Sequence, residues 1–187
     1  GAGIGLIVAF SLWPRDYGSA LAPQEGEDVF GHYLKVATDA RVTVAVPQAE
    51  TGQGIWTGLA QLLADELGAR WEDVGIIPAP DSPVYANALL EGRMTAGATS
   101  VRAFHLPLRQ AGATARDLLT RAAAAEWGVV AEECTAKDGF VAHEGKRLGF
   151  GELAAKAAKL DPREPRLRAW GAGGLLGKPM PRLDLPA

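Results

Sequence analysis

Residues 50–61 read ETGQGIWTGLAQ, a glycine-rich turn that opens an amphipathic helix. Before the turn, Val42, Val44 and Val46 alternate with Thr43 and Ala45, the period-2 pattern of a half-buried strand. After the turn, apolar residues recur at helical spacing and a glycine follows where a helix should end. The stretch therefore predicts a strand, a tight turn and a helix over about 55–67. The residues that set the helix are Ile55, Leu59, Leu62, Leu63, Leu67 and the terminating Gly68.

The turn has the features of an anion site. Gly52 and Gly54 allow backbone amides to approach a ligand closely, and a helix N-terminus presents free N–H groups to a negative charge. A tight strand-to-helix turn with no ligand is the commoner meaning of a lone Gly-x-Gly pattern. A second feature elsewhere in the chain is needed to decide between an anion site and a turn that binds no ligand.

Composition limits the possible functions. The 187 residues are 48% hydrophobic and 22% charged, the balance of a globular protein that can bury a core. A net charge of −3 and 7% aromatic residues give no case for nucleic acid as a partner. Cys134 is the single cysteine, which excludes an internal disulfide and an all-cysteine iron–sulfur site. His32, His105 and His143 are far apart in sequence, so we predict no protein-ligated metal.

The first residues suggest export. Residues 1–13 are apolar apart from Ser11, and Pro14 ends the run. A bilayer span needs about twenty residues, so this stretch is too short to cross and suits a signal h-region or a membrane-anchor remnant over 1–14. We therefore predict a periplasmic protein that can be anchored through its N-terminus. A buried first strand over residues 6–10 is the alternative.

Strand and helix signals alternate along the rest of the chain. The long second helix is rich in alanine and leucine, which favours close packing, and Pro107 marks either its start or a kink. The order of elements predicts an α/β (α+β) fold, a mixed sheet with two main helices packed on it. The expected elements are strands over 30–36, 41–46 and 74–78, a loop over 78–95, a helix over about 100–127, a hairpin over 140–150 and a helix over 152–160.

The two flanks of this region have a different character. Residues 15–34 read as a polar connector that contains glycine and proline. Residues 161–187 hold five prolines and the Gly-Ala-Gly-Gly run at 171–174, so they predict an extended inter-domain linker without a core of its own. The folded portion is expected over 35–160.

A second candidate loop precedes the second helix. Small and hydroxyl residues gather at Gly97, Ala98, Thr99 and Ser100, followed by Arg102. Thr99 or Ser100 capping the helix is the simpler interpretation. Two helix N-termini, each after a glycine-containing turn, can also converge on one polyphosphate. That convergence is a stronger hypothesis than either loop alone.

Together the two loops resemble a known family. Two parts of the chain are similar to the molybdopterin-binding region of the xanthine dehydrogenase/aldehyde oxidase family. The first is Thr51-Gly52-Gln53-Gly54 with the helix that follows it. The second is Gly97-Ala98-Thr99-Ser100-Val101-Arg102 with Pro107-Leu108-Arg109-Gln110-Ala111-Gly112-Ala113 behind it. The resemblance is strongest to the large (beta) subunits of the branch of isoquinoline 1-oxidoreductase-like and membrane-associated aldehyde dehydrogenases. It covers most of residues 35–187, which makes 35–160 a molybdopterin-binding portion.

The resemblance implies which residues touch the cofactor. Gly52, Gln53 and Gly54 would supply one set of contacts, with the Gln53 amide the best single candidate. The second set would come from Gly97, Ala98, Thr99 and Ser100, with Arg102 as a phosphate partner or else a solvated helix residue. Two departures affect the fine contacts, since Thr51 stands where methionine is common and Ala98 where glycine is common.

The resemblance also implies the chemistry of the whole enzyme. Such a molybdenum hydroxylase oxidises aldehydes or N-heterocycles with water as the oxygen source. It implies molybdopterin, in the cytosine dinucleotide form for a bacterial member, and as partners the remainder of the large subunit, a small [2Fe–2S] subunit and a membrane cytochrome c subunit.

No catalytic residue is expected in this stretch. The family's catalytic glutamate lies late in a much longer chain, whereas Glu152 reads as a first-turn acidic residue favoured by the helix dipole. This stretch alone is therefore expected to be inactive. A non-catalytic pyrophosphate- or nucleotide-binding or assembly module is the alternative, and a purely structural or interaction domain is the third.

Overall fold

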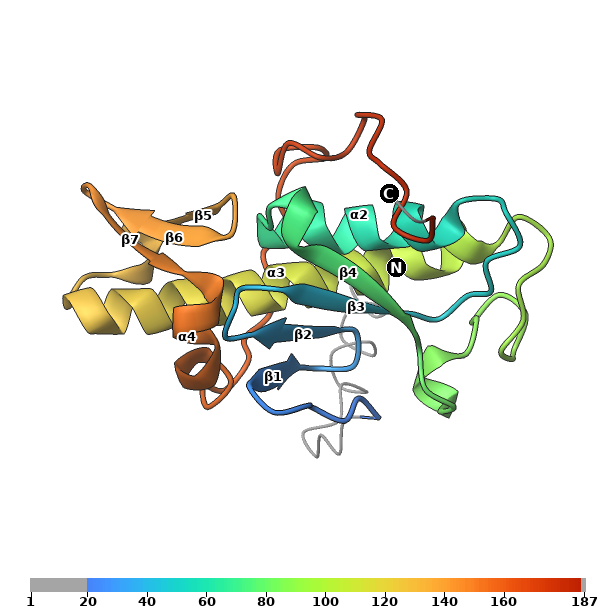
Figure 1. Ribbon diagram of the computed structural model, residues 1–187, viewed down its shortest axis with the longest axis horizontal. Helices are drawn as coiled ribbons and strands as arrows, with labels where there is room; N and C mark the ends of the chain where they lie inside the picture. Colours follow the sequence, from blue (N-terminus) through green and yellow to red (C-terminus); the bar gives the residue numbers. More distant parts are fainter. Residues whose placement is uncertain (1–19, 186–187) are drawn as a thin grey trace, which may run out of the picture.

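A computed structural model describes residues 20–185 of the chain. This part of the chain forms two sheets and three α-helices, whose arrangement Figure 1 shows. The expected α/β class, with a mixed sheet and two main helices packed on it, is confirmed. The strands are β1 (Glu27–Phe30), β2 (Leu34–Ala37), β3 (Val42–Val46), β4 (Val74–Pro78), β5 (Thr135–Lys137), β6 (Phe140–His143) and β7 (Lys146–Gly149), and the α-helices are α2 (Ile55–Leu67), α3 (Ser100–Trp127) and α4 (Phe150–Ala157).

The main sheet has the order β1-β2-β3-β4. Its first three strands pair antiparallel, whereas β3 and β4 are parallel and are joined through α2. A parallel pair needs such a crossover, and α2 supplies it. The expected strand is present, but all five residues of β3 are buried, so the expectation that it is half-buried is wrong. The strand lies inside the sheet, with a partner on each side.

The strand expected over residues 30–36 is also wrong. A turn at residues 31–33 divides it into β1 and β2, and β1 begins inside the range expected as a connector. Gly31 has a φ of 64°, a left-handed conformation that starts the turn. Tyr33 is buried in the turn and meets Tyr85 edge to face, with ring centroids 5.6 Å apart.

The helix α2 has the bounds expected from its periodicity, and Gly68 ends it with a φ of 82°. The helix α3 runs unbroken through Pro107 from Ser100, so its start near the proline is excluded. The two helices pack closely: a Cβ added to Gly112 would lie 2.4 Å from the Leu63 carbonyl oxygen. Small residues on α3 therefore set the helix separation, as their density in the sequence predicts.

A second sheet of order β5-β6-β7 contains the expected hairpin. The three-residue strand β5, which the sequence did not predict, pairs with β6. The last helix begins and ends earlier than the expected 152–160. The Glu152 carboxylate accepts a hydrogen bond of 2.6 Å from the Gly149 backbone N–H, so Glu152 caps α4.

The C-terminal segment lies along α2 without regular secondary structure (red in Figure 1). Thr57, Gln61 and Asp65 are four residues apart and so share one face of α2. Leu183 N–H donates to Thr57 Oγ1 at 3.0 Å, Gln61 Nε2 donates to the Leu175 carbonyl at 2.7 Å, and Leu175 N–H donates to Asp65 Oδ1 at 2.7 Å. We call residues 166–184 the strap. Its expected role as an inter-domain linker stays a prediction.

The expected signal or anchor segment over 1–14 lies outside the described residues. Within residues 20–185, no helix combines the length and the apolar character that a membrane crossing requires.

Candidate functional site

The candidate site lies at one end of the main sheet. The parallel strands β3 and β4 both run toward this end, and the N-termini of α2 and α3 lie there as well (Figure 1). In open α/β sheets, ligands bind outside the carboxyl ends of the strands, where helix N-termini gather. The fold therefore directs both candidate loops to the position where ligands are usually bound.

Hydrogen bonds join the two loops directly. Ala49 N–H donates to Thr95 Oγ1 at 2.8 Å, and Ser100 Oγ donates to Gln48 Oε1 at 2.7 Å. Gln48 is buried, and sequence analysis missed it. A polar side chain directly after the end of a buried strand was the available signal. The expected proximity of the two loops is confirmed.

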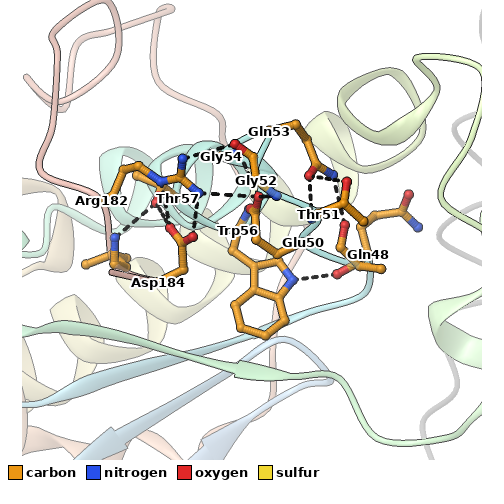
Figure 2. Close-up of polar contacts among 12 residues, drawn as sticks. Gln48, Glu50, Thr51, Gly52, Gln53, Gly54, Trp56, Thr57, Arg182 and Asp184 are labelled. Carbon is orange, nitrogen blue, oxygen red and sulfur yellow. Dashed lines mark hydrogen bonds and ion pairs between the residues drawn. The ribbon is translucent and has the colours of Figure 1, made fainter. Parts of the chain in front are cut away.

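The amides of the glycine turn are already in use. Glu50 folds its carboxylate into the turn and accepts from Gly52 and Gly54 N–H, each at 2.8 Å, and from Trp56 N–H at 3.1 Å (Figure 2). The expectation that these amides are free is therefore wrong for Gly52, Gly54 and Trp56. An acidic side chain close before a helix can complement its positive end, and that was the missed signal.

The side chain of Gln53 is held inside the same turn. Its Oε1 accepts from Thr51 N–H at 2.6 Å and from Thr51 Oγ1 at 2.8 Å, while its Nε2 donates to the Ala49 carbonyl at 2.9 Å (Figure 2). Thr51, a departure from the family pattern, thus has a structural role. Gln53 is exposed, and its contact with a cofactor stays a prediction that requires the amide to exchange partners.

The helix α3 begins differently. Thr99 holds the N-cap position, but its hydroxyl donates to the Ala96 carbonyl at 2.7 Å and accepts from Asn87 Nδ2 at 2.8 Å. The expected capping by Thr99 or Ser100 is therefore wrong. Among the described side chains, none accepts from the first N–H groups of α3, at residues 100–102. No described side chain acts at this helix end as Glu50 does on Gly52, Gly54 and Trp56.

The remaining predicted residues surround this open helix end. Gly97 and Ala98 are exposed and both left-handed, with φ values of 61° and 51°. Arg102 is exposed on the first turn of α3. The first N–H groups of α3 and the exposed Arg102 thus belong to the same helix turn, a combination that suits a phosphate.

Ala98 departs from the family pattern at a position that favours glycine. Because a non-glycine residue in the left-handed region is strained, we expect Ala98→Gly to raise the free energy of unfolding by about 0.5 to 1 kcal/mol. Urea unfolding followed by circular dichroism measures the change. Gly97→Ala introduces the same strain at the adjacent residue and should lower the free energy of unfolding. A change of the same sign and size in both variants would show that backbone strain at Ala98 is not the cause.

The Glu50 carboxylate should make stability depend on pH. Burial acts to raise its pKa, but the N–H groups of Trp56, Gly54 and Gly52 prevail and hold the pKa below the ordinary 4.5. A depressed pKa stabilises the fold above pH 4.5, and the contribution is lost as the pH falls through the lowered value. We therefore expect the stability difference between the wild type and Glu50→Gln to shrink as the pH falls below 4.5. Unfolding curves of both proteins at pH values above and below 4.5, with Arg182 and Asp184 unchanged, test this prediction. A stability difference that stays constant with pH would contradict it.

Comparison with known proteins gives consistent results. The family described as the molybdopterin cofactor-binding domain matches residues 2–173. The chain is 36% identical over 127 residues to the beta subunit of isoquinoline 1-oxidoreductase from Brevundimonas diminuta, covering 66% of the chain and 16% of that protein. It is 33% identical over 124 residues to membrane-bound aldehyde dehydrogenase [pyrroloquinoline-quinone] of Gluconacetobacter polyoxogenes (66% and 15%).

Two further matches extend the comparison. The B subunit of nicotinate dehydrogenase from Pseudomonas putida is 32% identical over 169 residues, covering 89% of the chain and 14% of that protein. The crystal structure of quinoline 2-oxidoreductase from Pseudomonas putida 86 matches with a TM-score of 0.47 and 24% identity, over 68% of the chain and 16% of that protein. The chain thus spans only 14% to 16% of the length of the curated relatives that it matches.

Proposed function

We propose that this chain, which belongs to the molybdopterin cofactor-binding domain family, supplies part of the cofactor site of a molybdenum hydroxylase. The whole enzyme would oxidise aldehydes or N-heterocycles. The cofactor, when bound, carries the oxidation with water as the oxygen source, and the protein binds and orients it. The names of two relatives, isoquinoline 1-oxidoreductase and nicotinate dehydrogenase, support an N-heterocyclic substrate.

The observation that carries the proposal is the junction of the two loops through Ser100, Gln48, Thr95 and Ala49. It places the open end of α3 beside the glycine turn. The first N–H groups of α3 and the Arg102 guanidinium would bind the phosphates, with Gly97 and Ala98 allowing a close approach. Gly52 and Gly54 would shape the turn that carries Gln53. Gln53 and Thr99 would complete the contacts by exchanging their present hydrogen-bond partners for the cofactor.

Further features of the enzyme belong to the same proposal. A dinucleotide form of the cofactor, with cytosine as the base, fits a site built from phosphate donors. This chain holds one cysteine and so cannot bind an iron–sulfur cluster by itself, and the proposal includes a small [2Fe–2S] partner subunit. Two relatives are themselves named as single subunits, beta and B, of larger enzymes, which supports the presence of other subunits. A periplasmic location, with a membrane cytochrome c subunit as electron acceptor, follows the expected export segment over 1–14.

Cofactor analysis of the complete protein that carries this chain tests the function. We expect molybdenum by mass spectrometry and a cytidine nucleotide after acid hydrolysis. A quinone in place of molybdenum, the cofactor in one relative's name, would contradict the proposal. A nucleotide without molybdenum would favour the alternative, a non-catalytic pyrophosphate- or nucleotide-binding module.

A matched pair of variants locates the site within the chain. Arg102→Gln is expected to lower the molybdenum content severalfold, because it removes a phosphate partner at the open helix end. Arg147→Gln removes the same charge from β7 in the second sheet and should leave the content unchanged. Equal contents in the two variants would exclude Arg102 from the site.

A further inference from the structure

The glycine turn is tied to a residue 130 positions away in sequence. Arg182 of the strap donates from Nη1 to the Gly52 carbonyl at 3.1 Å and from Nη2 to Glu50 Oε1 at 3.4 Å (Figure 2). Asp184 holds the same guanidinium from the other side, with Nη2 to Oδ2 at 2.5 Å and Nε to Oδ1 at 3.0 Å. The turn, Glu50 and Arg182 thus form one connected network.

The position of Arg182 is itself fixed by the strap. Thr57 accepts from Leu183 N–H and donates to Asp184 Oδ1 at 3.3 Å, which holds the two residues that follow Arg182 at the first turn of α2. Farther along α2, the buried Asp65 carboxylate accepts from three strap amides, those of Gly173, Leu175 and Leu176. The strap is therefore bound along the length of the helix.

Glu50 also determines which helix end is open to an anion. Its side chain is only 11% exposed, and its negative charge lies at the start of α2, bound to the N–H groups of Gly52, Gly54 and Trp56. A phosphate at that position would meet like-charge repulsion from Glu50 and would find three of the amides already bound to it. The start of α3, beside Ser100, has no such competitor among the described side chains.

We propose that Glu50 and Arg182 are positioning residues: together they hold the Gly52–Gly54 turn in its binding shape before the cofactor arrives and direct the cofactor's phosphates to α3. The turn then contributes the Gln53 side chain, and its amides remain bound to Glu50. The strap is in this way part of the cofactor site. The step from turn to cofactor rests on the proposed function, whereas the step from strap to turn does not.

Amide hydrogen exchange of the cofactor-free complete protein tests the first step. Glu50→Gln and Arg182→Gln should each speed exchange in the segment 50–57 by about tenfold, since each weakens charge-assisted bonds that protect these amides. Arg41→Gln, which breaks an exposed ion pair in the turn between β2 and β3, should leave that segment unchanged. Unchanged exchange in both Glu50→Gln and Arg182→Gln would overturn the proposal.

A third variant moves the strap without removing a charge. A Cβ at Gly173 would lie 1.9 Å from the Asp65 carbonyl oxygen, so Gly173→Ala must displace the strap there and should also speed exchange in segment 50–57. In the loaded protein, all three variants should lower the molybdenum content severalfold. Full molybdenum content in all three would overturn the positioning role. A wild type without molybdopterin would refute the proposed function, and the exchange rates would still decide whether the strap holds the turn.

Discussion

Replacement of Glu66 by alanine is expected to lower the free energy of unfolding by about 3 to 5 kcal/mol, because it leaves two largely buried arginines without their carboxylate partner. The Glu66 side chain is fully buried in α2. Its carboxylate pairs with Arg109 at 2.5 Å and Arg116 at 3.0 Å, both from α3, and accepts from the Arg168 backbone N–H of the strap at 3.0 Å. One carboxylate thus joins α2, α3 and the strap.

Denaturant unfolding of the complete protein measures this effect. Glu126→Ala is the matched control, since Glu126 pairs with Lys156 between exposed side chains and such pairs contribute about 0 to 1 kcal/mol. Comparable losses in the two variants would show that the buried network does not hold the helices together.

Gly112→Ala is expected to cost about 2 to 3 kcal/mol, because the new methyl group overpacks the contact between the two main helices. The Cβ would lie 2.4 Å from the Leu63 carbonyl oxygen and 3.0 Å from the Glu66 Cβ, so α2 and α3 must move apart. The higher helix propensity of alanine offsets only about 1 kcal/mol of the clash.

Gly58→Ala is a control for this prediction, because we expect it to raise the free energy of unfolding instead of lowering it. Gly58 lies inside α2, and a Cβ there meets nothing within 4 Å. Alanine should therefore raise stability by about 0.5 to 1 kcal/mol through helix propensity alone. Thermal unfolding of both variants checks the pair, and a stabilising Gly112→Ala would contradict the close helix contact.

The helices were the most predictable part of the fold. The periodicity of α2 and the glycines at its two ends gave bounds that the structure reproduces, because those glycines are left-handed at 54 and 68. The division of β1 from β2 was missed because Phe30, Leu34 and Val36 fit the alternation of one strand, whereas the turn between them depends on Gly31. The strand β5 was missed because three residues are too few to show a period.

The candidate site was predictable only in its position. The paired glycine turns placed both loops at one end of the sheet, and the Ser100–Gln48 contact confirms that placement. The acidic Glu50 before a helix was a local signal, but the role of Arg182 was not predictable, because it depends on a contact across 132 residues that no local pattern encodes. The contacts with the cofactor itself stay predictions.

A crystal structure of the complete protein with its cofactor bound is the most direct test of the central claim, that the two loops form one molybdopterin site. We expect phosphate oxygens within about 2.7 to 3.2 Å of the first N–H groups of α3. Glu50 should still accept from Gly52 and Gly54, as it does here. A cofactor bound away from both loops, or a phosphate in the place of the Glu50 carboxylate, would contradict the account.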